Sequence, residues 1–328
     1  MTAPTSIPSD PTAAYGLTAD ELWHSSFRSM GSPIRVQLGI GTARPQRCHA
    51  QVRALFNEAD RQCTRFDPYS DLMRANAAGD DWHEVGVHCF VALAAAYDAH
   101  LLTDGMFEPR VLTTLTEMGY GKSWPAVGAP DVATAATTAP PAVPWEPGFD
   151  EERRVVRVGP HPIDLGGIGK GLTLRWAAEL LRDSGAEVFL VDAGGDCVMS
   201  GGGPDGGGWR VGVEDPAGGS APVAVLVIDS GGCATSSTRL RRWRAGGEDV
   251  HHLIDPRTGR SGGGELRSVT VVHPDPAEGE VWSKTLFLHG AAIADEAERR
   301  QLAALWVDSG GAVRFSAAMR DHLLWWRE

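Results

Sequence analysis

The sequence predicts an α+β fold, an antiparallel sheet with flanking helices. Two observations support this prediction. Short segments rich in β-branched and apolar residues dominate the second half of the chain, whereas apolar residues at the helical spacing occur in only a few segments. Strands that follow one another without regularly alternating helices favour α+β over a doubly wound parallel sheet.

The first half contributes a tail, a strand and two helices. Residues 1–20 are rich in Pro, Ser and Thr and predict a flexible tail, so the folded domain is expected over 21–328. Residues 34–40 alternate like a strand. Residues 52–62 and 88–102 carry apolar residues at the helical period and predict two helices.

The second half begins with a long loop, expected over the Pro/Ala/Thr-rich residues 124–147, and a strand over 153–158. A helix follows Gly171, and Gly185 suits a left-handed C-cap. Glycines 201–203 and 206–208 predict a flexible hairpin tip. The remaining strands are expected at Val188–Asp192, Trp209–Glu214, Val223–Asp229 and Leu266–His273.

Composition sets the class of protein. With 328 residues and 42% hydrophobic content, the chain can bury a sizeable core as one large domain or two joined lobes. No run of eighteen apolar residues and no basic start with an apolar segment is present, so we expect a soluble, cytoplasmic protein. The five cysteines are scattered without a C-x-x-C pair, which argues against a disulfide framework or a zinc site.

The net charge and its distribution exclude some classes of binding partner. A formal net charge of −12 argues against nonspecific binding to nucleic acid or to an anionic membrane. One basic cluster interrupts this pattern, and we expect it to form a solvated helix or loop face near the functional site, with docking of an acidic protein substrate as the alternative. Its members are Arg239, Arg241, Arg242 and Arg244.

The most informative segment runs from Asp164 to Gly171, with the sequence D-L-G-G-I-G-K-G, directly before the predicted helix. Glycines allow a ligand to approach the backbone, the helix start adds a positive dipole end, and Lys170 adds a point charge. Anion binding, such as binding of a nucleotide diphosphate, is the expected outcome.

Two known phosphate loops do not fit this segment. The pattern G-x-x-x-x-G-K-[ST] fails because Asp164 and Gly171 stand at its two ends. The pattern G-x-G-x-x-G, started at Gly167, fails because Leu172 stands where the last glycine is required.

Taken with several other motifs, the glycine-lysine segment resembles the ApbE family, the FAD:protein FMN transferases. The resemblance covers roughly residues 30–290 and implies a T-fold-like body of antiparallel sheet and helices. Its most specific parts are the glycine-lysine segment and H-H-L-I-D-P-R-T-G at residues 251–259. The other motifs are M-G-S at 30–32, T-R-F-D-P-Y-S-D-L-M-R-A-N at 64–76, G-M-F-E-P at 105–109 and A-T-S at 234–236.

The resemblance implies a reaction that moves FMN from FAD onto a Thr or Ser hydroxyl of an acceptor flavoprotein, with release of AMP. His252 then stands where the family has a histidine at the site, with a pKa suited to accepting a proton. Phe66 replaces the usual Tyr, and Glu108 the usual Asp. The implied contacts with FAD are Met30, Phe66, Met106, Phe107, Glu108, Asp164, Lys170, Thr235 and Leu253. In the same string we expect Asp255 and Arg257 to brace a turn.

The implied Mg²⁺ site departs from the family pattern. By resemblance, a main-chain oxygen of the glycine loop, at Gly167, and an Asp and a Thr would hold the ion. Here Glu280 replaces the Asp and Lys284 replaces the Thr; a carboxylate can still ligate, but a charged lysine cannot. We expect Lys284 to supply part of the cation's charge and to pair with Glu280. A shifted alignment would instead bring Thr285 to the ligand position.

These departures predict slower transfer, or FAD binding without transfer. Two alternatives to the transferase therefore remain: a noncatalytic FAD-binding protein, and an FAD pyrophosphatase that uses water as the acceptor.

Overall fold

The computed structural model describes residues 22–121, 138–141 and 143–328. The predicted tail and most of the loop expected over 124–147 lie outside the described residues. No helix in the described ranges is long and apolar enough to cross a membrane.

An eight-stranded sheet forms the body of the molecule, and every neighbouring pair in it is antiparallel. The antiparallel sheet predicted from the sequence is therefore confirmed. In sheet order the strands are β1 (Leu22–Ser29), β2 (Ser32–Gly39), β6 (Phe189–Ala193), β7 (Asp196–Ser200), β10 (Gly231–Ser237), β15 (Leu266–His273), β16 (Ala303–Asp308) and β17 (Val313–Phe315).

Smaller sheets complete the strand inventory of the described chain. A three-stranded sheet joins β18 (Leu323–Trp326), β9 (Pro222–Ile228) and β8 (Trp209–Glu214). Because β7 and β8 belong to different sheets, the glycines between them link two sheets, and the predicted hairpin tip is wrong. The other small strands are β3 (His83–Glu84), β4 (Gly148–Asp150), β5 (Val155–Arg157), β11 (Arg242–Ala245), β12 (Glu248–His251), β13 (Ile254–Asp255) and β14 (Arg260–Ser261).

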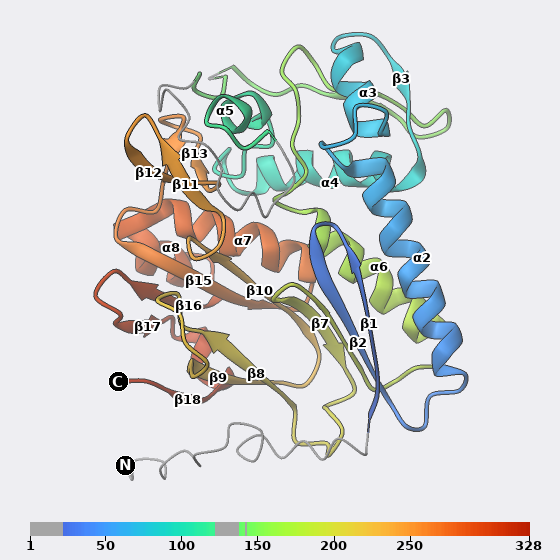
Figure 1. Cartoon of the computed structure of the whole chain (residues 1–328), viewed down its shortest axis with the longest axis vertical. Helices are drawn as coiled ribbons and strands as arrows, with labels where there is room; N and C mark the ends of the chain where they lie inside the picture. Colours follow the sequence, from blue (N-terminus) through green and yellow to red (C-terminus); the bar gives the residue numbers. More distant parts are fainter. Residues whose placement is uncertain (1–21, 122–137, 142) are drawn as a thin grey trace.

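The two faces of the large sheet are covered differently. Helices α2 (Pro45–Cys63), α6 (Gly169–Asp183) and α7 (Pro276–His289) pack on one face, as Figure 1 shows. Side chains alternate accordingly along a strand. On β7, Val198 packs in the cluster beneath α2 and α6, whereas Met199 joins the core shared with the three-stranded sheet.

The remaining helices lie above the sheet body in Figure 1 or beside α7. Helix α4 packs with its neighbours into a separate core that also receives Leu172 of α6 and Val281 of α7. This upper core and the sheet body therefore meet at the beginning of α6 and along α7. The helices are α3 (Asp71–Ala78), α4 (Val87–Leu102), α5 (Leu112–Glu117) and α8 (Ile293–Arg299).

Most of the predicted elements are present. The helix expected after Gly171 begins at Gly169, and Gly185 has a φ of 79°, as a left-handed cap requires. Helix α7 was not predicted, because most of its residues are buried on all sides and no apolar stripe at the helical period marks it.

Candidate functional site

A pocket of about 280 Å³ lies where the upper core meets the sheet body. It is bounded by the end of α2, the loop after α4, the glycine loop before α6, the segment from β11 to β13, and α7. Its lining includes ten of the thirteen predicted site residues: Met30, Phe66, Met106, Phe107, Glu108, Asp164, Gly167, Lys170, His252 and Lys284.

Met30 reaches the pocket from the tip of the β1–β2 hairpin. Met30 and Gly31 form the two-residue turn, with φ values of 50° and 69°, as a type I′ turn requires. A side chain in this left-handed conformation costs about 1–2 kcal/mol. The Met30 N–H donates to Asp60 Oδ2 at 3.0 Å, which fixes the turn at the edge of the pocket.

The Asp164 carboxylate organises the beginning of the glycine loop. Its Oδ1 accepts from the Gly166 N–H at 2.7 Å, and its Oδ2 lies 2.7 Å from Arg65 Nε in a buried ion pair. The guanidinium of Arg65 also lies over the rings of Phe66 and Tyr120, at 4.4 and 4.5 Å. Arg65 and Tyr120 were not predicted as site residues; Arg65 lies within the quoted T-R-F motif, whereas no motif marks Tyr120.

A carboxylate of this chain accepts a hydrogen bond from an N–H group at the start of α6. The Gly171 N–H donates to Glu280 Oε2 at 2.7 Å. A Cβ at Gly171 would lie only 2.5 Å from the Pro276 carbonyl oxygen and 2.6 Å from Ala277 Cα, so glycine allows α6 and α7 to approach closely. Gly171 therefore serves helix packing and binds Glu280, rather than leaving its N–H free for a ligand.

Lys170 is surrounded by two carboxylates. Its ammonium forms an ion pair with Asp196 and lies 3.9 Å from Glu280 Oε1. Burial lowers the pKa of Lys170 to about 8, although Glu280 opposes this shift. Lys170 is therefore a cation at neutral pH whose charge is largely balanced from within the protein.

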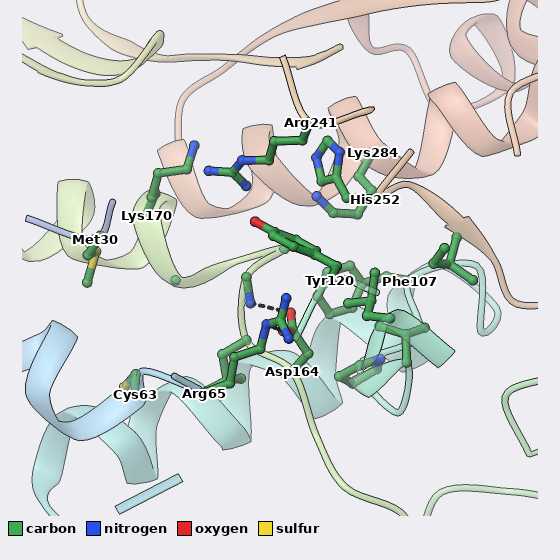
Figure 2. Close-up of a pocket in the computed structure, with 18 of the residues that line it drawn as sticks. Met30, Cys63, Arg65, Phe107, Tyr120, Asp164, Lys170, Arg241, His252 and Lys284 are labelled. Carbon is green, nitrogen blue, oxygen red and sulfur yellow. Dashed lines mark hydrogen bonds and ion pairs between the residues drawn. The ribbon is translucent and has the colours of Figure 1, made fainter. Parts of the chain in front are cut away.

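Three further basic groups face the same cavity. Figure 2 shows Arg241, His252 and Lys284 on the side of the pocket that also carries Lys170. Burial lowers the pKa of Lys284, and burial together with the charges of Arg241 and Lys284 lowers the pKa of His252 well below its usual value. His252 is therefore neutral at neutral pH, and its buried Nδ1 has no partner in the described structure.

The arginine cluster predicted as a solvated face divides into two groups. Arg242 and Arg244 on β11 are exposed, and Arg239 pairs with Glu214 at 2.6 Å. Arg241 is half-buried and lines the pocket, so it lies near the site, as expected, but not on a solvated face. Side-chain alternation explains the difference, because Arg241 directly precedes the exposed Arg242 and its side chain points to the other side, into the pocket (Figure 2).

Aromatic and apolar side chains form the opposite wall. Phe107 is buried and Phe66 is 40% exposed, and Figure 2 shows the Tyr120 ring between the cationic side chains and the Arg65–Asp164 pair. Such surfaces suit stacking against a planar ring. Glu108 lies at this wall, but its carboxylate is bound to Arg110 at 2.8 Å.

Three of the predicted site residues do not line the pocket. Leu253 is fully buried in the core beneath α7. The Thr235 N–H donates to Asp196 Oδ1 at 3.0 Å, and its hydroxyl lies 2.9 Å from that of Thr270. Glu280 lies behind the pocket, where it holds the start of α6.

The turn after His252 follows the sequence prediction. Arg257 Nη2 lies 2.7 Å from Asp255 Oδ2, and the Gly259 N–H donates to the Asp255 carbonyl at 2.9 Å. This paired charge braces the turn, as expected. The expected pairing of Lys284 with Glu280 is absent from the ion pairs of the described residues, although Glu280 raises the pKa of Lys284 through its charge.

Comparison with known proteins identifies the family. Residues 30–306 match the model of the ApbE family. A Klebsiella pneumoniae "FAD:protein FMN transferase" is 28% identical over 93% of this chain and 86% of its own, and a Haemophilus influenzae protein of the same name is 25% identical over 90% of each chain.

Solved structures show the same fold. The Thermotoga maritima ApbE protein has a TM-score of 0.78 at 24% identity, covering 94% of this chain and 100% of its own. The flavin transferase ApbE from Vibrio cholerae has a TM-score of 0.74 at 21% identity, covering 92% and 99%. The match over most of the chain, together with the antiparallel sheet and the glycine-lysine loop, shows that this chain belongs to the ApbE family.

Proposed function

We propose that this chain is an FAD:protein FMN transferase. It would move FMN from FAD onto a Thr or Ser hydroxyl of an acceptor protein and release AMP. The observation that carries the proposal is one pocket that combines an aromatic wall with a row of cationic side chains beside the glycine loop. Relatives that bear this activity in their names align with nearly the whole chain.

The two walls suit the two kinds of group in FAD. Ring systems can stack on Phe66, Phe107 and Tyr120, with Met30 and Met106 at the edge. The pyrophosphate can lie against Lys170, Arg241 and Lys284, where preorganised positive charge stabilises the additional charge of the transition state. A cavity of about 280 Å³ is small for a ligand pocket, so part of FAD must extend into the open mouth.

The chemical step requires few groups. The acceptor hydroxyl oxygen attacks the phosphorus that carries the riboflavin, a new P–O bond forms, and the bridging P–O bond breaks so that AMP leaves with its oxygen. The hydroxyl proton must leave at the same time. His252 lines the pocket and is neutral at neutral pH, so it is the side chain placed to accept this proton. Its lowered pKa makes it a weaker base than the sequence-based expectation of an ordinary histidine pKa.

Several predicted contacts support the site indirectly. Asp164 shapes the glycine loop and holds Arg65 under the aromatic wall. Thr235 orients Asp196, which in turn pairs with Lys170. Leu253 positions its neighbour His252 from the core. These residues would act by placing other groups in the pocket.

The proposal is tested by incubating the full chain with FAD and an acceptor domain that carries a candidate Thr or Ser. AMP release by chromatography and a flavin mass adduct on the acceptor are the two readouts. Equal amounts of AMP and adduct support the transferase. FMN formed without acceptor would identify a pyrophosphatase, and FAD bound but unchanged would identify a flavin-binding protein.

A Thr or Ser of the acceptor protein as the attachment point and the cytoplasmic location expected from the sequence are part of this proposal. Fractionation of cells, followed by detection of the chain in the cytosolic fraction, tests the location. A covalent flavin on a protein of the same fraction tests the acceptor.

A further inference from the structure

The expected carboxylate ligand of a divalent cation, Glu280, and the neighbouring carboxylate of Asp196 are already engaged. Both Glu280 oxygens face partners, the Gly171 N–H at 2.7 Å and the Lys170 ammonium at 3.9 Å. Asp196 accepts from the Thr235 N–H at 3.0 Å and pairs with Lys170. The described residues hold no group of three His, Cys, Asp or Glu side chains that could bind a metal. Mg²⁺ at a phosphate site usually keeps several waters and takes one or two carboxylates together with substrate oxygens. Here the one expected carboxylate, Glu280, is engaged and a lysine stands where a hydroxyl ligand is expected, so these residues do not fit Mg²⁺.

Lys284 occupies the space beside the expected main-chain ligand. A Cβ built on Gly167 would lie 2.8 Å from Lys284 Cε, so the end of the lysine side chain lies against the glycine loop. The shifted alignment that would offer Thr285 as a ligand is excluded, because the Thr285 hydroxyl is buried and donates to the Val281 carbonyl at 2.9 Å.

Two of the pocket cations form no ion pair among the described residues, although the charges of Glu280 and Asp164 act on Lys284 from a greater distance. Neither Arg241 nor Lys284 forms an ion pair with a carboxylate in the described structure, whereas Lys170 has two carboxylates nearby. A pyrophosphate diester carries one negative charge on each phosphate. The two unpaired side chains can therefore balance it, and a dication placed between them would meet like charges.

Lysine is rare in this chain, and two of its lysines lie at the pocket. Of its 30 basic residues only Lys122, Lys170 and Lys284 are lysine, and two of these three line the pocket. Arginine supplies the positive charge almost everywhere else. An ammonium is a compact point charge, closer to a metal ion in size than a planar guanidinium, and it fits the narrow space against Gly167.

We propose that Lys284, together with Arg241, takes the place of a divalent cation, so that this chain binds and polarises the pyrophosphate of FAD without Mg²⁺. This inference rests on the proposed function for its substrate, FAD. The bond changes are those of the transfer described above, and the ammonium and guanidinium stabilise charge on the phosphate oxygens without being consumed.

The first test measures FAD affinity by quenching of flavin fluorescence, with Mg²⁺ and with EDTA. For the unaltered chain the two dissociation constants should agree within about twofold. Lys284→Met and Arg241→Met should each weaken binding by about 10- to 100-fold, the usual effect of losing a charged hydrogen bond. Arg242→Met, which alters the exposed neighbour on β11, is the matched control and should leave the affinity unchanged.

The second test asks whether a ligand for the metal can be restored. Lys284→Thr should bind FAD weakly in EDTA and regain at least about tenfold in affinity with Mg²⁺. Electron paramagnetic resonance with Mn²⁺ should detect no bound ion on the FAD-loaded unaltered chain, and bound ion on Lys284→Thr. Thermal unfolding of each variant separates a lost contact from a lost fold, and Arg241→Met provides the same test on a different segment.

Stoichiometric Mn²⁺ on the unaltered chain, or loss of FAD binding in EDTA, would overturn the inference. The transfer assay run in parallel distinguishes the two proposals. If no FMN is transferred in either buffer, the proposed function fails, while the affinity and Mn²⁺ measurements still decide whether Lys284 replaces the metal.

Discussion

Replacing Gly171 by alanine tests the close approach of α6 and α7. The new Cβ would lie 2.5 Å from the Pro276 carbonyl oxygen and 2.6 Å from Ala277 Cα, both backbone atoms that cannot rotate away. Relieving the overlap must separate the helix starts and stretch the 2.7 Å bond from the Gly171 N–H to Glu280. Overpacking costs about 1–3 kcal/mol, and a bond to a charged group contributes about 1.5–3 kcal/mol.

Because one displacement causes both effects, we expect Gly171→Ala to lower the free energy of unfolding by about 3 kcal/mol. With a urea slope of about 3 kcal/mol/M, the unfolding midpoint would fall by about 1 M. Gly169→Ala is the matched control, since a Cβ there meets nothing within 4 Å and alanine favours the helix. Equal midpoints for the two variants would refute the packing argument.

Three further predictions concern the pocket. Asp164→Asn should lower the unfolding free energy by about 3–5 kcal/mol, because it leaves the buried Arg65 charge unpaired, and adding Arg65→Met should recover part of the loss in urea unfolding. Gly167→Ala should weaken FAD binding in a fluorescence titration more than it lowers the melting temperature, because the new Cβ meets Phe107 and the flexible end of Lys284; the reverse order would contradict this. FAD affinity should fall as the pH rises through about 8, because Lys170, whose pKa is lowered to about 8, loses its positive charge there. Lys170→Met should bind weakly at every pH tested, and a fall of equal size in this variant would assign the titration to another group.

The sequence by itself determined the class of fold and the position of the main motifs. Local patterns sufficed for β2, α2 and α4, because each presents one apolar face at the period of its own secondary structure. Strand β15 is buried on both faces and was recognised from its run of apolar and β-branched residues. The glycine-lysine loop was also placed correctly before α6, since its glycines and the following apolar spacing are local signals.

The tertiary structure decided what those motifs contact. The glycine loop as a whole was predicted to bind an anion, but the N–H of its last residue, Gly171, donates to a carboxylate of the protein 109 positions away on α7. Arg241 was predicted to lie on a solvated face, but it turns into the cavity beside Lys284. Neither outcome can be predicted from a short stretch of the sequence, because both depend on how α7 and the segment before β11 pack against the glycine loop.

The site therefore divides according to the range of its interactions. The sequence sufficed to locate Lys170 at a helix start and the D-P-R-T-G turn after His252, because both features depend on neighbours along the chain. Which cations are balanced and which face the ligand was decided only by the fold. Charge pairing depends on distance in space, and the carboxylates that pair with Lys170 come from elements far from it in the chain, whereas Lys284 forms no ion pair among the described residues.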